Sequence, residues 1–251
     1  MALTIAGSDP TGGAGLQMDL QIFARHGVHG MAVPTALTVQ STDAVRAVHP
    51  TFPSTVAEQL SAALENLEPD VVKIGMLATD DIVLRLATLV EALPVPRIVD
   101  PVLRASDGSF LLERRAWGHL MERIVAGCTL VTPNLDEARE LTGESDPERA
   151  ARVFLEAGAG AALIKGGHRD GDPDDLLLTP EGLHWLRGRR VASEPIHGTG
   201  CALSAAIAAR LARGEPLLRA VEGAKRLVLA GIERAAASGS RLLVLDSSPL
   251  P

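Results

Sequence analysis

Residues 197–201, with the sequence HGTGC, combine residue types and spacing that suggest anion chemistry. They precede a run of small residues typical of a helix, so backbone N–H groups at Gly198, Thr199 and Gly200 could surround an anion beside the positive end of the helix dipole. A thiol in such a first turn is expected to have a lowered pKa, and Cys201 could then take a proton from an attacking hydroxyl. A buried, inert cysteine is the alternative. A cysteine hydrolase with His197 as base is disfavoured, because adjacent turn residues rarely have suitable geometry.

A second glycine-rich segment, GSDPTGGAG at residues 7–15, follows the first expected strand and opens a helix. Its glycines allow close approach of the backbone to a ligand at a helix N-terminus. The spacing matches neither a P-loop nor the dinucleotide fingerprint, and a plain glycine-rich turn is the alternative. Asp19 follows on the helix, where a solvated carboxylate is equally possible. Gln40, at the end of the second expected strand, carries a donor and an acceptor, as the edge of an aminopyrimidine would require.

Charged residues follow three later strands in the sequence, in the segments 100–102 (DPV), 132–137 (TPNLDE) and 165–168 (KGGH). Asp100 and Glu137, at neighbouring strand ends, could hold Mg²⁺ directly or through its waters. Lys165 could neutralise phosphate charge as it builds up during group transfer. Asn134 is also well placed to cap a helix, and the two interpretations of this segment are compatible.

Short β-like runs alternate with longer helical patterns through most of the chain. The expected strands are 2–6, 30–39, 71–74, 97–100, 129–132 and 161–165, and the helices between them are 14–26, 53–67, 80–92, 116–125, 135–141 and 147–157. This alternation predicts an α/β fold with a mainly parallel sheet, in which ligands bind at the carboxyl ends of the strands. Two further strands, 176–179 and 182–186, and two helices, 200–213 and 216–237, complete the pattern. We expect a single domain over residues 1–251.

Composition narrows the class of protein. The formal net charge of −7 argues against nonspecific binding to nucleic acid or anionic membranes, and no apolar run approaches the about 18–20 residues of a membrane span. Two distant cysteines do not indicate a disulfide framework, so a cytoplasmic location is expected. The histidines show no metal-ligand spacing. Of the 24 lysines and arginines only three are lysines, Lys73, Lys165 and Lys225. This suggests that these three positions need the compact charge of an ammonium group and not the planar guanidinium of arginine.

Taken in order, these segments resemble the hydroxymethylpyrimidine/phosphomethylpyrimidine kinase family of thiamine biosynthesis, within the ribokinase superfamily. The resemblance covers nearly the whole chain. It is carried by residues 6–10 with Asp19, 35–37 with Gln40, 73–77, 100–102, 132–134 with Glu137, 165–168 and 197–201.

The resemblance implies a ribokinase-like three-layer αβα sandwich with a central, mainly parallel sheet, usually in a homodimer. It implies two ATP- and Mg²⁺-dependent phosphorylations, first of 4-amino-5-hydroxymethyl-2-methylpyrimidine and then of its monophosphate, giving the diphosphate. Pyridoxal kinase activity is the close alternative, because related vitamin kinases share this architecture. A non-catalytic pyrimidine-binding sensor is the alternative from another class, and the joint presence of Asp100, Glu137, Lys165 and Cys201 speaks against it.

The resemblance also implies a role for individual residues. Asp19 and Gln40 would contact the pyrimidine, and its pocket would be formed by Gly7, Val39, Met76 and Val102. Asp100 and Glu137 would organise Mg²⁺, whereas Asn134, Lys165 and Lys225 would serve the nucleotide. Gly198, Thr199, Gly200, Cys201 and Lys165 would carry the catalysis, with Cys201 in the place that a catalytic aspartate holds in sugar kinases.

Two departures from the family pattern stand out. After residues 100–102 the family commonly continues with Met and a Lys-Ser-Gly loop, whereas residues 103–108 here read LRASDG, so the usual lysine is missing. Whether Arg104 replaces it is open. Pro195 and Ile196 stand before His197, where Asn-Thr is frequent in the family.

Overall fold

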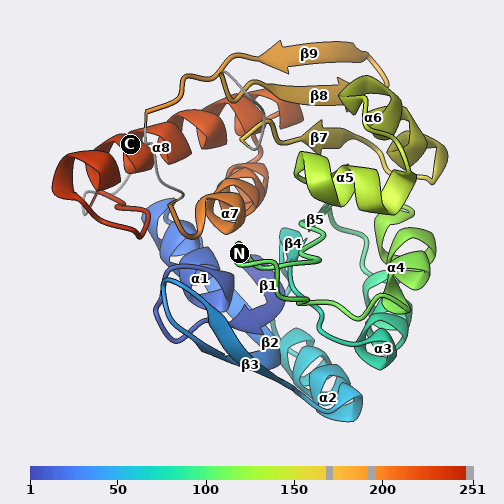
Figure 1. Ribbon diagram of the computed structural model, residues 1–251. Helices are drawn as coiled ribbons and strands as arrows, with labels where there is room; N and C mark the ends of the chain where they lie inside the picture. Colours follow the sequence, from blue (N-terminus) through green and yellow to red (C-terminus); the bar gives the residue numbers. More distant parts are fainter. Residues whose placement is uncertain (168–171, 192–195, 247–251) are drawn as a thin grey trace.

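The computed structural model describes residues 1–167, 172–191 and 196–246 (Figure 1). Its strands form one sheet in the order β3-β2-β1-β4-β5-β6-β7-β8-β9. The strands are β1 (Ala2–Ser8), β2 (Gly30–Gln40), β3 (Val45–Pro50), β4 (Val71–Ile74), β5 (Arg97–Val99), β6 (Leu130–Val131), β7 (Ala162–Ile164), β8 (Asp175–Thr179) and β9 (Gly182–Leu186). Strands β2, β1, β4, β5, β6 and β7 are parallel, and β3, β8 and β9 are antiparallel additions. The predicted mainly parallel sheet is therefore confirmed.

Helices cover both faces of this sheet. They are α1 (Gly15–Arg25), α2 (Pro53–Leu64), α3 (Asp80–Val90), α4 (Ala116–His119), which continues into the π-helix η1 (Leu120–Val125), α5 (Leu135–Thr142), α6 (Pro147–Glu156), α7 (Thr199–Ala212) and α8 (Leu217–Ser238). Two cores result, because successive strand residues point to opposite faces. One core lies under α2 to α6, and the other lies under α1, α7 and α8. The predicted three-layer αβα sandwich is thus confirmed.

Strand β3 is the main element that the sequence pattern does not indicate. It pairs antiparallel with the end of β2 and forms one edge of the sheet. Its residues are half-buried or exposed, so they lack the apolar run that marked the buried strands. The hairpin of β2 and β3 extends the wall around the strand ends. His168 and Pro195, which the sequence analysis singled out, lie outside the described residues.

Local capping explains where the helices of the site begin. Helix α5 opens with a capping box, in which Asn134 accepts from the N–H of Glu137 at 2.9 Å and Glu137 accepts from the N–H of Asn134 at 2.8 Å. Helix α7 instead begins after Gly198, whose φ of 88° is left-handed. Among the described residues, no helix combines the length and apolarity needed to cross a membrane.

Candidate active site

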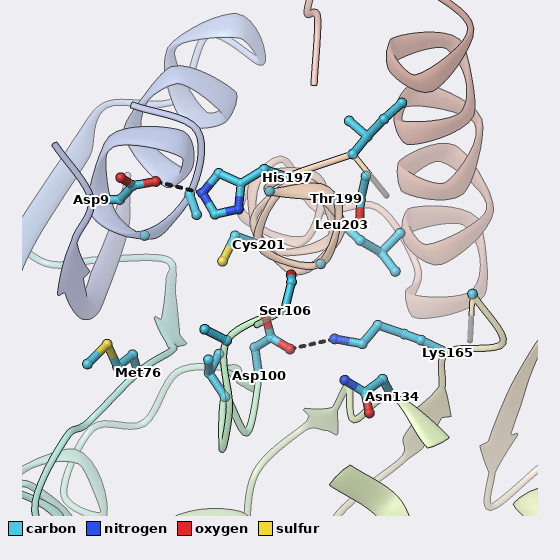
Figure 2. A pocket seen from close by; sticks show the side chains of 18 of the residues that line it. Asp9, Met76, Asp100, Ser106, Asn134, Lys165, His197, Thr199, Cys201 and Leu203 are labelled. Carbon is cyan, nitrogen blue, oxygen red and sulfur yellow. Dashed lines mark hydrogen bonds and ion pairs between the residues drawn. The ribbon is translucent and has the colours of Figure 1, made fainter. Parts of the chain in front are cut away.

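A cavity of about 350 Å³ lies at the carboxyl ends of the parallel strands, where the α/β pattern predicts ligand binding. Its wall comes from the segments that follow β1, β2, β5, β6 and β7, together with the first turn of α7 and one face of α8. Figure 2 shows Asp100 and Lys165 opposite the start of α7, with Asp9 and His197 on the side of α1. The predicted sites on separate strand ends therefore meet in one place.

Asp100 is an almost completely buried carboxylate directly after β5. One of its oxygens accepts from Lys165 Nζ at 2.8 Å and Thr132 Oγ1 at 3.2 Å, and the other accepts from Ser204 Oγ at 3.1 Å. Burial disfavours the charged form, but Lys165 and Lys73 outweigh it, so the pKa of Asp100 lies below its usual range. Asp100 therefore keeps its negative charge at neutral pH.

Lys165 connects Asp100 to the first turn of α7. Its backbone N–H donates to Pro133 O at 2.8 Å, which fixes the end of β7 against the segment before α5. Its ammonium lies close to Gly200, where an added Cβ would stand 3.3 Å from Lys165 Nζ. Burial opposes the charge, yet Asp100 and Glu137 raise the pKa of Lys165 above its usual range. The site thus holds a permanent cation beside the helix N-terminus.

Glu137 and Asn134 line the same cavity while they cap α5. Burial raises the pKa of Glu137 to about 7, although Lys165 and the N–H of Asn134 act in the opposite direction. The alternative interpretation of Asn134 as an N-cap is therefore confirmed. Its predicted contact with a nucleotide stays a prediction.

The carboxylates of the site fit a magnesium ion that also binds substrate phosphates. No group of three or more His, Cys, Asp or Glu side chains among the described residues could hold a metal. Mg²⁺ at kinase sites needs fewer, because it keeps waters and takes one or two carboxylates plus phosphate oxygens. Asp100 and Glu137 both face the cavity, and a nearby cation would favour the ionised form of Glu137 that burial disfavours.

The first turn of α7 lies at the cavity, as the predicted anion-binding loop requires. Gly198, Thr199, Gly200 and Cys201 all line the cavity, and the first N–H groups of a helix have no partner inside it. Only glycine fits at position 198, since its φ is left-handed and an added Cβ would stand 1.7 Å from Gly13 O. The loop at 197–201 therefore packs directly against the glycine-rich loop at 7–15, with Gly198 next to Gly13 O.

Cys201 lies in this first turn, but its thiol does not have the predicted lowered pKa. Burial raises the pKa of Cys201 to about 11, and Lys73 only partly offsets this effect. The prediction was wrong because burial, together with the nearby carboxylates Asp100 and Asp19, disfavours the thiolate more than Lys73 favours it. At neutral pH the thiol is protonated, which weakens the case for Cys201 as the base.

Asp19 is also placed differently from the prediction. Its carboxylate is completely buried, accepts from Lys73 Nζ at 2.8 and 3.1 Å and from Thr4 Oγ1 at 2.6 Å, and does not line the cavity. The predicted direct contact with the pyrimidine is therefore wrong in this geometry. Lys73 lies between Asp19 and the cavity floor, and Asp19 with its other neighbours raises the pKa of Lys73 despite its burial.

The remaining predicted pocket residues divide clearly. Gly7, Gln40, Met76 and Val102 line the cavity. Gly7 and Met76 are adjacent, since a Cβ on Gly7 would stand 2.7 Å from Met76 Sδ. Val39 does not line the cavity and is 46% exposed, because alternate residues of β2 point to opposite faces of the sheet. The prediction for Val39 is wrong in this geometry.

Lys225 reaches the cavity from α8, and its predicted contact with the nucleotide stays a prediction. Its ammonium donates to Asp175 Oδ2 at 2.6 Å and to Pro173 O at 2.9 Å. Asp175 also accepts from the N–H of Gly166 at 2.8 Å, so this pair holds the segment after β7. Arg104 stacks on Phe110 and donates to a Glu140 oxygen at 3.1 Å.

Sequence reasoning missed two residues that the fold brings into the site. Asp9 is buried and its Oδ2 lies 2.8 Å from His197 Nε2, although the two residues are far apart in sequence. Lys73 was noted for the scarcity of lysine and as part of the matching segment 73–77, but no local pattern showed that it would pair with Asp19. Spacing within one segment carries no information on such long-range contacts.

Comparison with known proteins identifies the family. The family model described as phosphomethylpyrimidine kinase matches residues 9–245. The chain belongs to this family. A hydroxymethylpyrimidine/phosphomethylpyrimidine kinase of Streptomyces coelicolor is 40% identical over 237 residues, which cover 92% of this chain and 88% of the relative. The family assignment makes the chain a phosphotransferase and confirms the resemblance inferred from its motifs.

Solved structures of the family's neighbours show the same fold. A phosphomethylpyrimidine kinase from Clostridium difficile 630 superposes with a TM-score of 0.81 at 34% identity and covers 92% of this chain and 98% of its own. A pyridoxal kinase from Staphylococcus aureus, in complex with AMP-PCP and pyridoxal, has a TM-score of 0.87 at 31% identity. The superposition covers 99% of this chain and 93% of the pyridoxal kinase chain. The ribokinase-like fold and the use of ATP are thus supported by related kinases.

Proposed function

We propose that this kinase transfers the γ-phosphoryl group of ATP to 4-amino-5-hydroxymethyl-2-methylpyrimidine and then to its monophosphate. The observation that carries the proposal is a single cavity with two ends of different chemistry. Gln40, Met76 and Gly7 offer a ring-binding wall at one end. Lys165, Asp100 and the first turn of α7 gather charge and N–H donors at the other.

Positioning and charge stabilisation account for the chemistry of the site. Phosphoryl transfer spreads negative charge over the transferred oxygens. Backbone N–H groups at 198–201 and Lys165, which line the cavity, would stabilise that charge. Asp100 and Glu137 would hold Mg²⁺, which would supply positive charge against the negative charge of the phosphates. Because the Cys201 thiol is protonated at neutral pH, we assign most of the rate enhancement to the backbone N–H groups of the loop and to Lys165.

The test is a product assay with ATP, Mg²⁺ and hydroxymethylpyrimidine that follows monophosphate and diphosphate over time. Successive appearance of the two products supports the proposal. Pyridoxal in parallel assays tests the second candidate, which is favoured by the likeness to the pyridoxal kinase of S. aureus. Phosphorylation of pyridoxal without phosphorylation of the pyrimidine would overturn the first proposal.

Binding of the pyrimidine in calorimetry without release of ADP would indicate a non-catalytic sensor. Chelation of Mg²⁺ should abolish product formation.

Two further expectations belong to this proposal. A homodimer is supported by the exposed Leu37 and Val39 on β2 beside the open sheet edge at β3, and sedimentation of the purified chain tests it. A cytoplasmic location is supported by Cys128 and Cys201, which are both free thiols. Fractionation of cells that express the tagged chain tests the location.

A further inference from the structure

His197 contacts two side chains of the site through a single ring nitrogen. His197 Nε2 lies 2.8 Å from Asp9 Oδ2 and 3.1 Å from the amide nitrogen of Gln40. Asp9 is buried, and hydrogen bonds from His197 and Thr11 outweigh burial and lower the pKa of Asp9. A carboxylate only accepts hydrogen bonds. His197 Nε2 must therefore carry a hydrogen, which is directed at Asp9.

This hydrogen determines which way the Gln40 amide faces. A ring N–H donates and cannot accept a hydrogen bond. With the Gln40 amide nitrogen facing His197 Nε2, two donors would meet and their hydrogens would repel each other. The two ends of a glutamine amide have nearly the same shape, and their partners decide which end lies where. Turned end for end, the amide places its oxygen against the His197 N–H. The repulsive contact then becomes a hydrogen bond.

Thr38 supports the same orientation from the other end of the amide. Its hydroxyl lies 3.0 Å from Ser8 O and 3.3 Å from the second end of the Gln40 amide. The single hydroxyl hydrogen serves the carbonyl oxygen, which can only accept. A lone pair of Thr38 Oγ1 is then free to accept from the Gln40 NH₂ group. Every donor in the chain from Asp9 to Ser8 has an acceptor in this arrangement.

We infer that His197, held by Asp9, is a positioning residue that fixes the order of donor and acceptor on Gln40 and thereby the direction of the substrate ring. The inference rests on the proposed function. The Gln40 oxygen, on the His197 side, receives the 4-amino group, and the NH₂ group, on the Thr38 side, donates to the ring nitrogen N3. Because the 5-hydroxymethyl group neighbours the 4-amino group, it then points toward residues 198–201.

The backbone around His197 fixes the position of its imidazole ring. The N–H of His197 donates to Arg241 O at 2.9 Å, and its carbonyl accepts from the N–H of Leu243 at 3.3 Å. An added Cβ on Gly13 would stand 2.7 Å from His197 Cδ2, so the imidazole packs tightly on the first glycine-rich loop. His197 is thus held from both sides in the position that contacts Gln40.

The first experiment observes the histidine directly in the unmodified protein. Long-range ¹H–¹⁵N spectra of protein labelled at histidine distinguish the two ring nitrogens, and loss of one signal set in His197→Gln assigns His197. We expect Nε2 to carry hydrogen from pH 6 to 8. A spectrum with hydrogen on Nδ1 alone would overturn the inference without any mutant affinity being needed.

The second experiment is a double-mutant cycle between His197→Leu and Gln40→Leu, read by calorimetric affinity for hydroxymethylpyrimidine and for pyridoxal. Each single change should weaken pyrimidine binding about tenfold, as loss of hydrogen bonding to a buried partner does. The double variant should lose no more than either single one. His197→Gln, which keeps an N–H donor, should recover part of the affinity. Pyridoxal lacks the paired amine and ring nitrogen, so its affinity should change less.

Controls separate the possible failures. His119→Leu removes a histidine that also pairs with an aspartate, at 2.7 Å from Asp80, but it does not line the cavity and should leave both affinities unchanged. Affinity for AMP-PCP reports whether each variant is folded. Additive losses in the cycle, or unchanged pyrimidine affinity in His197→Leu, would refute the positioning role. A wild-type protein that neither binds nor phosphorylates the pyrimidine would instead refute the proposed function.

Discussion

Lys73 Nζ lies 2.8 Å from Asp19 Oδ2, and both side chains are completely buried. Removing one partner leaves an uncompensated buried charge, which typically costs about 3–5 kcal/mol. Lys73→Met and Asp19→Leu should each lower the free energy of unfolding by about that amount. The double variant should recover most of the loss, since both positions are then apolar. Urea denaturation followed by tryptophan fluorescence measures these differences.

A surface ion pair provides the control for this prediction. Arg123 and Glu91 meet at 3.2 Å with side chains that are 39% and 43% exposed. Arg123→Ala should change stability by less than about 1 kcal/mol, because solvent screens exposed pairs. If Lys73→Met had an equally small effect, the ion pair with Asp19 would not be a structural requirement of the fold.

Gly198 should be irreplaceable for catalysis, whereas a glycine of similar backbone geometry should not. Gly198→Ala places a Cβ against Gly13 O, so the first turn of α7 must move and kcat should fall about 10²–10³-fold. Gly214 has a φ of 82° with no atom within 4 Å of an added Cβ. Gly214→Ala should cost about 1–2 kcal/mol of stability and leave kcat unchanged. Equal kcat values for both variants would contradict the proposed anion-binding loop.

Lys165 and Lys225 should differ in the kinetic parameter that they control. Lys165 Nζ lies beside Gly200 and Asp100, so Lys165→Met should lower kcat by about 10²–10³-fold. Lys225 is held by Asp175 and Pro173 at the α8 side of the cavity. Lys225→Met should mainly raise the KM for ATP. Steady-state kinetics with ATP varied at saturating pyrimidine separates the two effects, and a pure KM effect in Lys165→Met would remove it from the chemical step.

The raised pKa of Cys201 predicts how its thiol behaves with pH. With a pKa of about 11, the thiolate fraction rises about tenfold per pH unit between pH 6 and 9, since the pH stays below the pKa throughout. Alkylation of the free protein by iodoacetamide should follow that slope without a plateau. Cys201→Ala identifies the signal, because the other free thiol, Cys128, is buried and its pKa is raised to about 12.

The same pKa predicts a modest kinetic effect of removing the thiol. A thiolate base would make Cys201→Ala lose about 10²–10⁴-fold in turnover, as expected for general base catalysis. Because the thiol is protonated at neutral pH, we expect Cys201→Ala to keep at least about a tenth of wild-type kcat at pH 7.5. A loss of 10²-fold or more would restore the thiol as the base.

Much of the fold was readable because its signals are local. Buried parallel strands appear as apolar runs and helices as longer periodic segments, so β1, β4 and α3 were predicted close to their observed bounds. Strand β3 escaped because its residues pair at an open sheet edge and need no apolar pattern. The sequence predicted the helix cap at Asn134 but not the reciprocal contact of Glu137, although the two residues of this capping box are only three apart.

The sequence by itself determined the family, the α/β class and the set of polar strand ends that meet at one edge, because glycine spacing, hydrophobic period and parallel topology constrain these directly. Only the tertiary structure decided which side chains are buried from solvent and which groups they pair with. It placed Asp19 behind Lys73, turned Val39 away from the cavity, raised the pKa of Cys201 and brought Asp9 to His197. Burial and charge pairing depend on segments distant in sequence, and they set both the protonation of a group and its access to a ligand.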